Sequence, residues 1–123
     1  MQSALDVLHE YYEAFSSLDL NAIVSYFGEP CMSISPQGVF SAATRQELAE
    51  AFAPFVAGLR AKGYGRSEFS EPEITTLSES AALVRGVAVR YLADGREMER
   101  VRISYLMHCK DAAWKIAVMV LPG

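Results

Sequence analysis

The stretch that decides the fold is AALVRGVAVRYLADGREMERVRISYLMHC, residues 81–109. Apolar and polar residues alternate over 81–92 and again over 97–109, which is the two-residue period of strands that have one buried face. Between these runs, Asp94 and Gly95 favour a tight turn with φ > 0, so we expect a two-residue hairpin loop. A third alternating run begins at 114, and the three runs together predict a meander of antiparallel strands.

The hairpin loop also predicts which residues share a face of the sheet. With Asp94 and Gly95 in the loop, Val84 faces Tyr105, and one face is almost wholly apolar. Past a turn expected at Asp111 and Ala112, this face continues into the third strand. Its members are Ala82, Val84, Gly86, Ala88, Val101, Ile103, Tyr105, Met107, Trp114, Ile116, Val118 and Val120. Each shielded Val or Ile contributes roughly 1.5 to 3 kcal/mol, so we expect helices to cover this face.

The opposite face of the predicted sheet mixes cationic and apolar side chains. Since burying unpaired guanidinium groups costs several kcal/mol each, this face cannot be the core. A soluble monomer nevertheless rarely exposes a large apolar patch, so we expect a homodimer formed through this face. The expected interface residues are Arg85, Val87, Arg100, Arg102, Leu106 and His108. The alternative is an exposed face on which arginine stems cover their apolar neighbours.

The residues before the meander predict helices and short strands. An apolar stripe predicts a helix over 4–18, and Asp19 can cap a second helix over 20–27 that Gly28 and Pro30 end. Short strands are expected over 31–35 and 38–41. Thr44 and Glu47 form a capping-box signal for a helix that reaches about residue 61, in which Pro54 predicts a kink or a late start. A strand to about 77 contains Pro72, which favours a sheet edge or a bulge.

Composition limits the classes of function. A chain of 123 residues with 51% hydrophobic content fits one domain, residues 1–123. Its pI near 5.1 and net charge of −4 do not favour a nucleic-acid partner. We expect no membrane segment and a cytoplasmic location, because no signal-like leader and no run of about 18 apolar residues occurs. We expect no cofactor and no metal, since no phosphate-loop, dinucleotide or metal-ligand spacing is present.

The order of these elements resembles the nuclear-transport-factor-2-like superfamily, which includes SnoaL-like proteins and ketosteroid isomerase. The segment that carries most of the resemblance is VLHEYYEAFSSLDLNAIVSYF, residues 7–27, and the strand around Trp114, Lys115 and Ile116 adds to it. The resemblance implies an α+β, cystatin-like cone with an N-terminal helical hairpin. In such a cone a curved, mostly antiparallel sheet wraps around a long helix and leaves an apolar pocket. The superfamily includes isomerases, dehydratases, cyclases and binding modules.

The similarity to ketosteroid isomerase also places three polar roles on this chain. It implies Tyr11 at the oxyanion-hole tyrosine, Ser35 at the basic aspartate and Tyr105 at the protonated aspartate. Neutral phenols can still polarise a carbonyl, but a serine without an adjacent base cannot remove a proton from carbon. We therefore assign no catalytic residue.

Three functions follow as hypotheses. The first is a homodimeric protein that binds a small apolar molecule through Tyr11, Tyr26, Ser35, Phe55, Tyr105 and Trp114. The second is a SnoaL-like isomerase, dehydratase or cyclase acting on an enone or polyketide-like substrate. The third is an interaction module without a ligand, in which Tyr11 and Tyr105 are core residues. A pocket of roughly 300 Å³ or more would favour the first two. Arg90 and Glu99 form either a surface pair or, through Arg90, an anion clamp at the pocket mouth.

Overall fold

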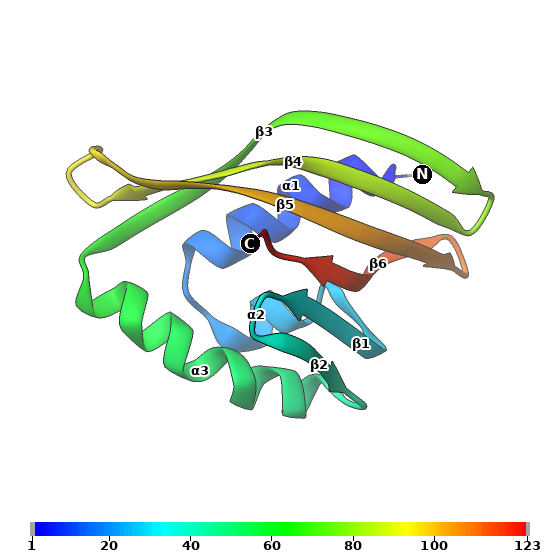
Figure 1. The fold of residues 1–123 in the computed structure, drawn as a ribbon, viewed down its shortest axis with the longest axis horizontal. Helices are drawn as coiled ribbons and strands as arrows, with labels where there is room; N and C mark the ends of the chain where they lie inside the picture. The colour runs from blue at the N-terminus through cyan, green and yellow to red at the C-terminus, as the bar shows by residue number, and fades with distance from the viewer. Residues whose placement is uncertain (1, 123) are drawn as a thin grey trace.

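Six strands and three helices make up the part of the chain that the computed structural model describes, residues 2–122 (Figure 1). In chain order they are α1 (Ala4–Ser16), α2 (Leu20–Val24), β1 (Phe27–Ser35), β2 (Gly38–Ala42), α3 (Arg45–Ala61), β3 (Tyr64–Ser78), β4 (Ala81–Leu92), β5 (Glu97–Lys110) and β6 (Ala113–Val120). The strands form one curved sheet in the spatial order β2-β1-β6-β5-β4-β3. The predicted antiparallel meander is present as β4, β5 and β6, while β1 pairs with β6 in parallel.

The β4–β5 hairpin has the predicted register but a different turn. Val84 faces Tyr105, as expected. The loop contains three residues instead of two, because the Leu92 N–H donates to the Arg96 carbonyl and the Gly95 N–H donates to the Leu92 carbonyl. Gly95 closes the turn at φ 92°, a conformation that glycine adopts at little cost.

A bulge in β5 compensates for the extra loop residue. Arg90 faces Glu99 and Tyr91 faces Glu97, so Met98 has no partner on β4. An extra residue in one strand moves the pairing by one position, which cancels the shift that the longer loop introduces. The predicted faces of β4 and β5 are therefore correct, although the predicted two-residue loop is wrong.

A second bulge, in β6, makes the predicted faces of this strand wrong beyond Ile116. The turn at Asp111 and Ala112 forms as expected, with φ of 52° and 62°. The pairing then shifts between Met107–Ile116 and Leu106–Val118, because Ala117 is an extra residue on β6. This bulge turns Met119 into the core and places Val118 and Val120 on the opposite face, which reverses the sides predicted for all three.

The N-terminal half follows the predicted pattern with shorter helices. Asp19 caps α2 as expected, but α2 ends at Val24, and the chain is already in β1 at Gly28 and Pro30. Thr44 caps α3, whereas the Glu47 carboxylate accepts from the Ala43 N–H instead of closing the box on Thr44.

The predictions for the two prolines inside elements, Pro54 and Pro72, agree with the structure to different degrees. The helix α3 begins at Arg45 and continues through Pro54 to Ala61, so the expected late start is absent. Pro72 lies in β3, an edge strand whose register shifts between Ser70 and Glu73, in agreement with both expectations for it.

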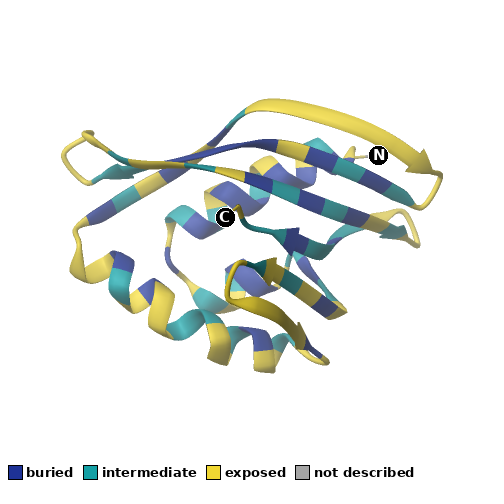
Figure 2. Cartoon of the chain, in the orientation of Figure 1, coloured by how far each residue is buried: buried dark blue, intermediate teal, exposed yellow. Residues whose placement is uncertain are grey.

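The apolar face of the sheet forms the core with the helices. α1 packs against β3, β4 and β6, and α3 contacts β1, β2 and β3. The largest fully buried side chains come from both layers: Tyr105, Phe27, Leu8, Ile23, Met107, Ile116 and Val84. Figure 2 shows that burial is concentrated where the helices meet the sheet and that the second half of β3 is exposed.

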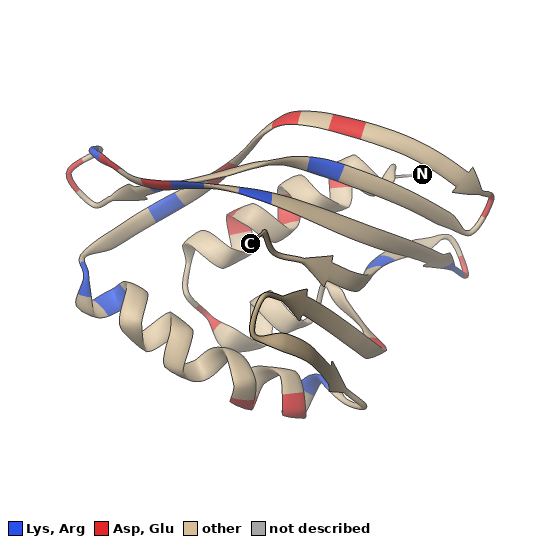
Figure 3. Ribbon diagram, viewed as in Figure 1, with Lys and Arg blue, Asp and Glu red and all other residues tan. Residues whose placement is uncertain are grey.

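The opposite face of the sheet, called the outer face below, carries charged residues on β4 and β5 (Figure 3). Among the residues predicted at a dimer interface, Arg85, Arg100, Arg102 and His108 are exposed, and Leu106 is half-buried. Val87 is already buried within one chain, opposite Arg102. Strand pairing aligns further apolar residues on this face, which we call the outer strip: Met32, Ile34, Leu83, Leu106, Val118 and Val120.

Gly86 tests the packing of the sheet against the core. A Cβ at Gly86 would lie 2.5 Å from Cζ of Phe69 and 2.9 Å from the Ser70 carbonyl oxygen. We expect Gly86→Ala to lower the free energy of unfolding by about 1–3 kcal/mol, because the buried ring and a backbone atom would both have to move. Urea unfolding measures the change. Gly58→Ala is the matched control, since its Cβ meets nothing within 4 Å on α3 and should be neutral or stabilising. Equal stability of Gly86→Ala and the wild type would contradict this packing.

Candidate functional site

An apolar cavity of about 160 Å³ lies between the helices and the inner face of the sheet. Its walls come from α1, α3, β3, β4, β5, β6 and the C-terminal residues. The lining residues are Tyr11, Tyr12, Phe15, Phe52, Phe55, Ser67, Ala88, Arg90, Ile103, Tyr105, Met119 and Leu121. The volume is about half of the roughly 300 Å³ expected for a drug-sized ligand. The cavity is thus smaller than the size that favours the first two hypotheses, although the core is not filled.

Two buried tyrosines are hydrogen-bonded to each other in the cavity wall. The hydroxyl oxygens of Tyr12 and Tyr105 lie 2.7 Å apart. Burial is the main cause that raises the pKa of each phenol, so both stay protonated at neutral pH. Because each buried hydroxyl has found a partner, this pair stabilises the wall between α1 and β5.

Tyr11 is the cavity phenol with an unused hydroxyl. Its ring makes edge contacts with Tyr12 and Tyr105, at centroid distances of 5.5 and 6.1 Å. Within residues 2–122 its hydroxyl makes no hydrogen bond to another side chain or to the backbone. Burial raises the pKa of this phenol, while the charge of Arg90 lowers it. Tyr11 therefore offers a neutral O–H donor to a molecule in the cavity.

Arg90 is the one charged residue among the lining residues that the structure describes. Its side chain is 11% exposed, and Nη1 pairs with a carboxylate oxygen of Glu99. The guanidinium also lies over the ring of Phe55, with Cζ 5.2 Å from the ring centroid. Nε of Arg90 is buried and has no hydrogen-bond partner. An unmet buried donor of this kind costs about 1–3 kcal/mol, so the site favours an acceptor there.

The structure brings three of the six predicted ligand residues to this cavity: Tyr11, Phe55 and Tyr105. Ser35 lies at the β1–β2 turn, where its hydroxyl accepts from the Gln37 N–H. Tyr26 and Trp114 line a separate surface hollow near Glu10 and Lys115.

Sequence reasoning missed Tyr12 and did not include Arg90 among the ligand residues. Tyr12 follows Tyr11 within the same apolar stripe, so the spacing gave a signal for both. Arg90 continues the alternation of Val84, Gly86 and Ala88, and this parity alone places it on the inner face. Its position near the hairpin loop left two predictions open, a surface pair with Glu99 or an anion clamp at the pocket mouth.

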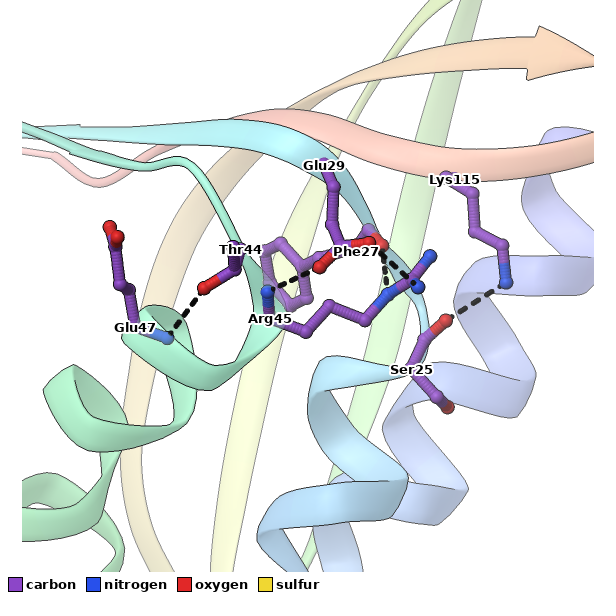
Figure 4. Close-up of polar contacts among 7 residues, drawn as sticks. All are labelled: Ser25, Phe27, Glu29, Thr44, Arg45, Glu47 and Lys115. Atoms are coloured by element: carbon purple, nitrogen blue, oxygen red, sulfur yellow. Dashed lines mark hydrogen bonds and ion pairs between the residues drawn. The ribbon is translucent and has the colours of Figure 1, made fainter.

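Cationic side chains outside the cavity hold the fold together (Figure 4). Arg45 donates from Nε to the Phe27 carbonyl at 2.9 Å and from its backbone N–H to Glu29 at 2.8 Å. Lys115 donates from Nζ to the Ser25 carbonyl at 2.9 Å, and burial lowers its pKa. These bonds fasten α3 to β1 and β6 to the end of α2, so the two cations are already engaged by the protein itself.

Neither a metal cluster nor a membrane helix is found in the described part of the chain. No three His, Cys, Asp or Glu residues within 2–122 are grouped so that they could hold a metal ion. No helix over the same residues is both long and apolar enough to cross a membrane.

Solved structures share this architecture at low sequence identity. An NTF-2 like protein of unknown function from Shewanella oneidensis MR-1 is 24% identical, with a TM-score of 0.72 over 97% of this chain and 95% of that one. A cystatin-like protein of unknown function from Nostoc punctiforme has a TM-score of 0.76 at 10% identity, over 96% of this chain and 86% of that one. A ketosteroid isomerase-like protein from Erwinia carotovora atroseptica SCRI1043 has a TM-score of 0.70 at 18% identity, over 97% of this chain and 92% of that one.

The family comparison agrees with these structural likenesses. No curated protein matches the sequence of the chain. A family model described as NTF2-like protein (DUF6841) matches residues 2–122. The chain belongs to this NTF2-like family.

Proposed function

We propose that this protein binds a small, mostly apolar molecule in the cavity, with Tyr11 as the hydrogen-bond donor to it. The observation that carries the proposal is an apolar space in the core that borders a phenol with a free hydroxyl. Ligand sites are typically apolar clefts with a few polar groups that set the orientation of the ligand. Tyr105 supports the site indirectly, because its hydroxyl is committed to Tyr12.

The volume of the cavity limits the size of the ligand. An apolar cavity of about 150 Å³ in a protein core holds a molecule the size of benzene. The cavity here measures about 160 Å³, so it suits a body of one ring or a short branched chain. A polycyclic body would require Phe52 or Phe55 on α3 to move.

Binding without turnover fits the lining better than isomerase, dehydratase or cyclase chemistry. Removal of a proton from carbon needs a base with a suitable pKa within reach of the substrate. Among the described lining residues there is no Asp, Glu or His, and the three phenols have raised pKa values. A pure interaction module is less favoured, because its core would have no reason to retain an unfilled space beside buried donors.

Acetophenone is a suitable probe for Tyr11, since it joins one ring to one carbonyl acceptor. We expect it to raise the Tm of the wild type by an amount that grows with ln(1 + [L]/Kd). Tyr11→Phe should weaken its Kd about 2- to 10-fold, the effect of one lost hydrogen bond, without lowering the stability of the free protein. Thermal-shift titration measures both. Tyr26→Phe is the matched control and should behave as the wild type, because Tyr26 lies outside the cavity. The same Kd in Tyr11→Phe would remove Tyr11 from the site.

We also propose that two copies pair through the outer face of the sheet. The outer strip offers apolar area, and Met32 and Ile34 within it are exposed. Twofold pairing is the commonest way for a protein to cover such a face. Arg85, Arg100 and Arg102 border the strip, and their carboxylate neighbours Glu73 and Glu97 balance two of them within each chain.

Substitution of one exposed isoleucine tests the dimer. Ile34→Glu places a charge in the outer strip, so we expect it to raise the dimer dissociation constant at least tenfold. Sedimentation velocity measures the mass from nanomolar to micromolar concentration. Ile74→Glu is the matched control, because Ile74 is also exposed on a strand but pairs with Val84 on the inner parity, outside the strip. A wild-type monomer at micromolar concentration would refute the proposed pairing.

A further inference from the structure

We propose that the ligand of the cavity is a small carboxylate, whose anionic group binds to Arg90 while its apolar body fills the space beside Tyr11. This inference rests on the proposed function and specifies the chemical class of its ligand. It starts from an arginine that has one hydrogen-bonding edge free inside an apolar wall.

The free edge follows from the geometry of the guanidinium group. Glu99 occupies Nη1, and the remaining edge consists of Nε–H and Nη2, which is the edge that carboxylates bind with two parallel hydrogen bonds. Nε on this edge is buried without a partner in residues 2–122. Neutral ligands could satisfy one of these donors, but a carboxylate satisfies both.

Arg90 differs from the other paired arginines of β4 and β5. The side chains of Arg85 and Arg100 also form ion pairs, but they are themselves 58% and 57% exposed, so water satisfies their remaining donors. Arg90 is only 11% exposed and borders the cavity. Its partner Glu99 is 46% exposed and does not line the cavity, so this carboxylate does not occupy the inner edge of the guanidinium. Because Nε is buried in the free protein, a ligand reaches it when a neighbouring side chain of the cavity wall moves aside.

The surroundings of Arg90 favour negative charge. No acidic residue lines the described cavity, and Tyr11 and Ser67 are among its lining residues. The Ser67 hydroxyl is bonded to Tyr64, so Tyr11 is the neutral donor left for a ligand. Burial raises the pKa of Tyr11, Tyr12 and Tyr105, and the charge of Arg90 opposes part of this rise at all three phenols. A bound carboxylate would thus meet one cation and one neutral donor, with no repelling anion in the wall.

The position of Arg90 also sets the orientation of the ligand. Phe55, over which the guanidinium lies, is 40% exposed and marks the side of the cavity that meets water. Ala88, Ile103 and Tyr105 lie farther than Arg90 from the hairpin loop along β4 and β5, and all three are buried. A carboxylate at Arg90 can stay partly hydrated while one ring is buried, and the ≈ 160 Å³ volume suits a single-ring or short branched acid.

The experiment compares phenylacetate with phenylacetamide, which has nearly the same shape and no charge. Both are titrated at pH 7 into ¹⁵N-labelled protein, and Kd is read from backbone shifts and from the Arg90 Nε–H signal. We expect phenylacetate to bind at least tenfold more tightly than the amide, and the Nε–H signal to move downfield only with the acid. Arg90→Met should reduce the preference to about twofold or less.

Two further variants separate loss of charge recognition from damage to the fold. Arg90→Met combined with Glu99→Gln leaves no unpaired carboxylate and should behave as Arg90→Met does. Arg85→Met is the matched control on the outer face of the same strand and should keep the full preference. If the Arg90 variants do not fold, the wild-type preference and its Nε–H shift decide the question alone.

The outcomes distinguish the inference from the proposed function. Equal binding of acid and amide by the wild type, or a preference that persists in Arg90→Met, would overturn the carboxylate assignment and leave the cavity as a site for neutral ligands. Binding of neither probe, with no response to acetophenone, would overturn the proposed function and the inference with it.

Discussion

The pairing register of β4 with β5 is the constraint on which the rest of the structure depends. It places Val84, Ala88, Ile103 and Tyr105 on one face, where α1 covers them. With β4 held against the helices, a slip of β5 by one position would turn Arg100 and Arg102 into the core in place of Ile103 and Tyr105, at a cost of several kcal/mol for each uncompensated charge. The alternation of side chains thus selects the fold by making the neighbouring register unfavourable, more than by any single contact.

The same register explains why one cation is tolerated inside. Arg90 shares the parity of the core residues but lies close enough to the hairpin loop to reach Glu99 across the ladder. The ion pair and the face of Phe55 offset part of its desolvation. A buried guanidinium with hydrogen-bond donors left unpaired on one edge lowers the stability of a closed core, but in a binding site the same donors can bind a ligand. Arg90 therefore gives the cavity the chemical asymmetry that the aromatic residues around it do not supply.

Much of the fold could be predicted from the sequence because its signals are local. Alternation of apolar and polar residues predicted the meander. The capping residues Asp19 and Thr44 predicted where α2 and α3 begin, and Pro72 predicted an edge strand or a bulge. The wrong predictions concern places where one extra residue in a strand or loop changes the side of the sheet that the following side chains face. Met98 compensated for a loop that is longer than expected, so the faces of β5 were right, whereas Ala117 was not anticipated, and the sides of Met119 and Val118 were exchanged.

The candidate site was harder to predict, since a cavity depends on how far α1 and α3 stand from the sheet. Parity identified Tyr105, and the helical stripe identified Tyr11. Ser35 came from the similarity to ketosteroid isomerase, and it lies at the β1–β2 turn, outside the residues that line the cavity.

The Ala117 bulge has a consequence for how such a pocket can change. If Ala117 paired within the ladder instead of bulging, strict alternation in β6 would turn Val118 instead of Met119 toward the cavity, while the strand order and the helices stay the same. Loss of the bulge without loss of a residue would therefore exchange one wall of the cavity and leave the rest of the core in place.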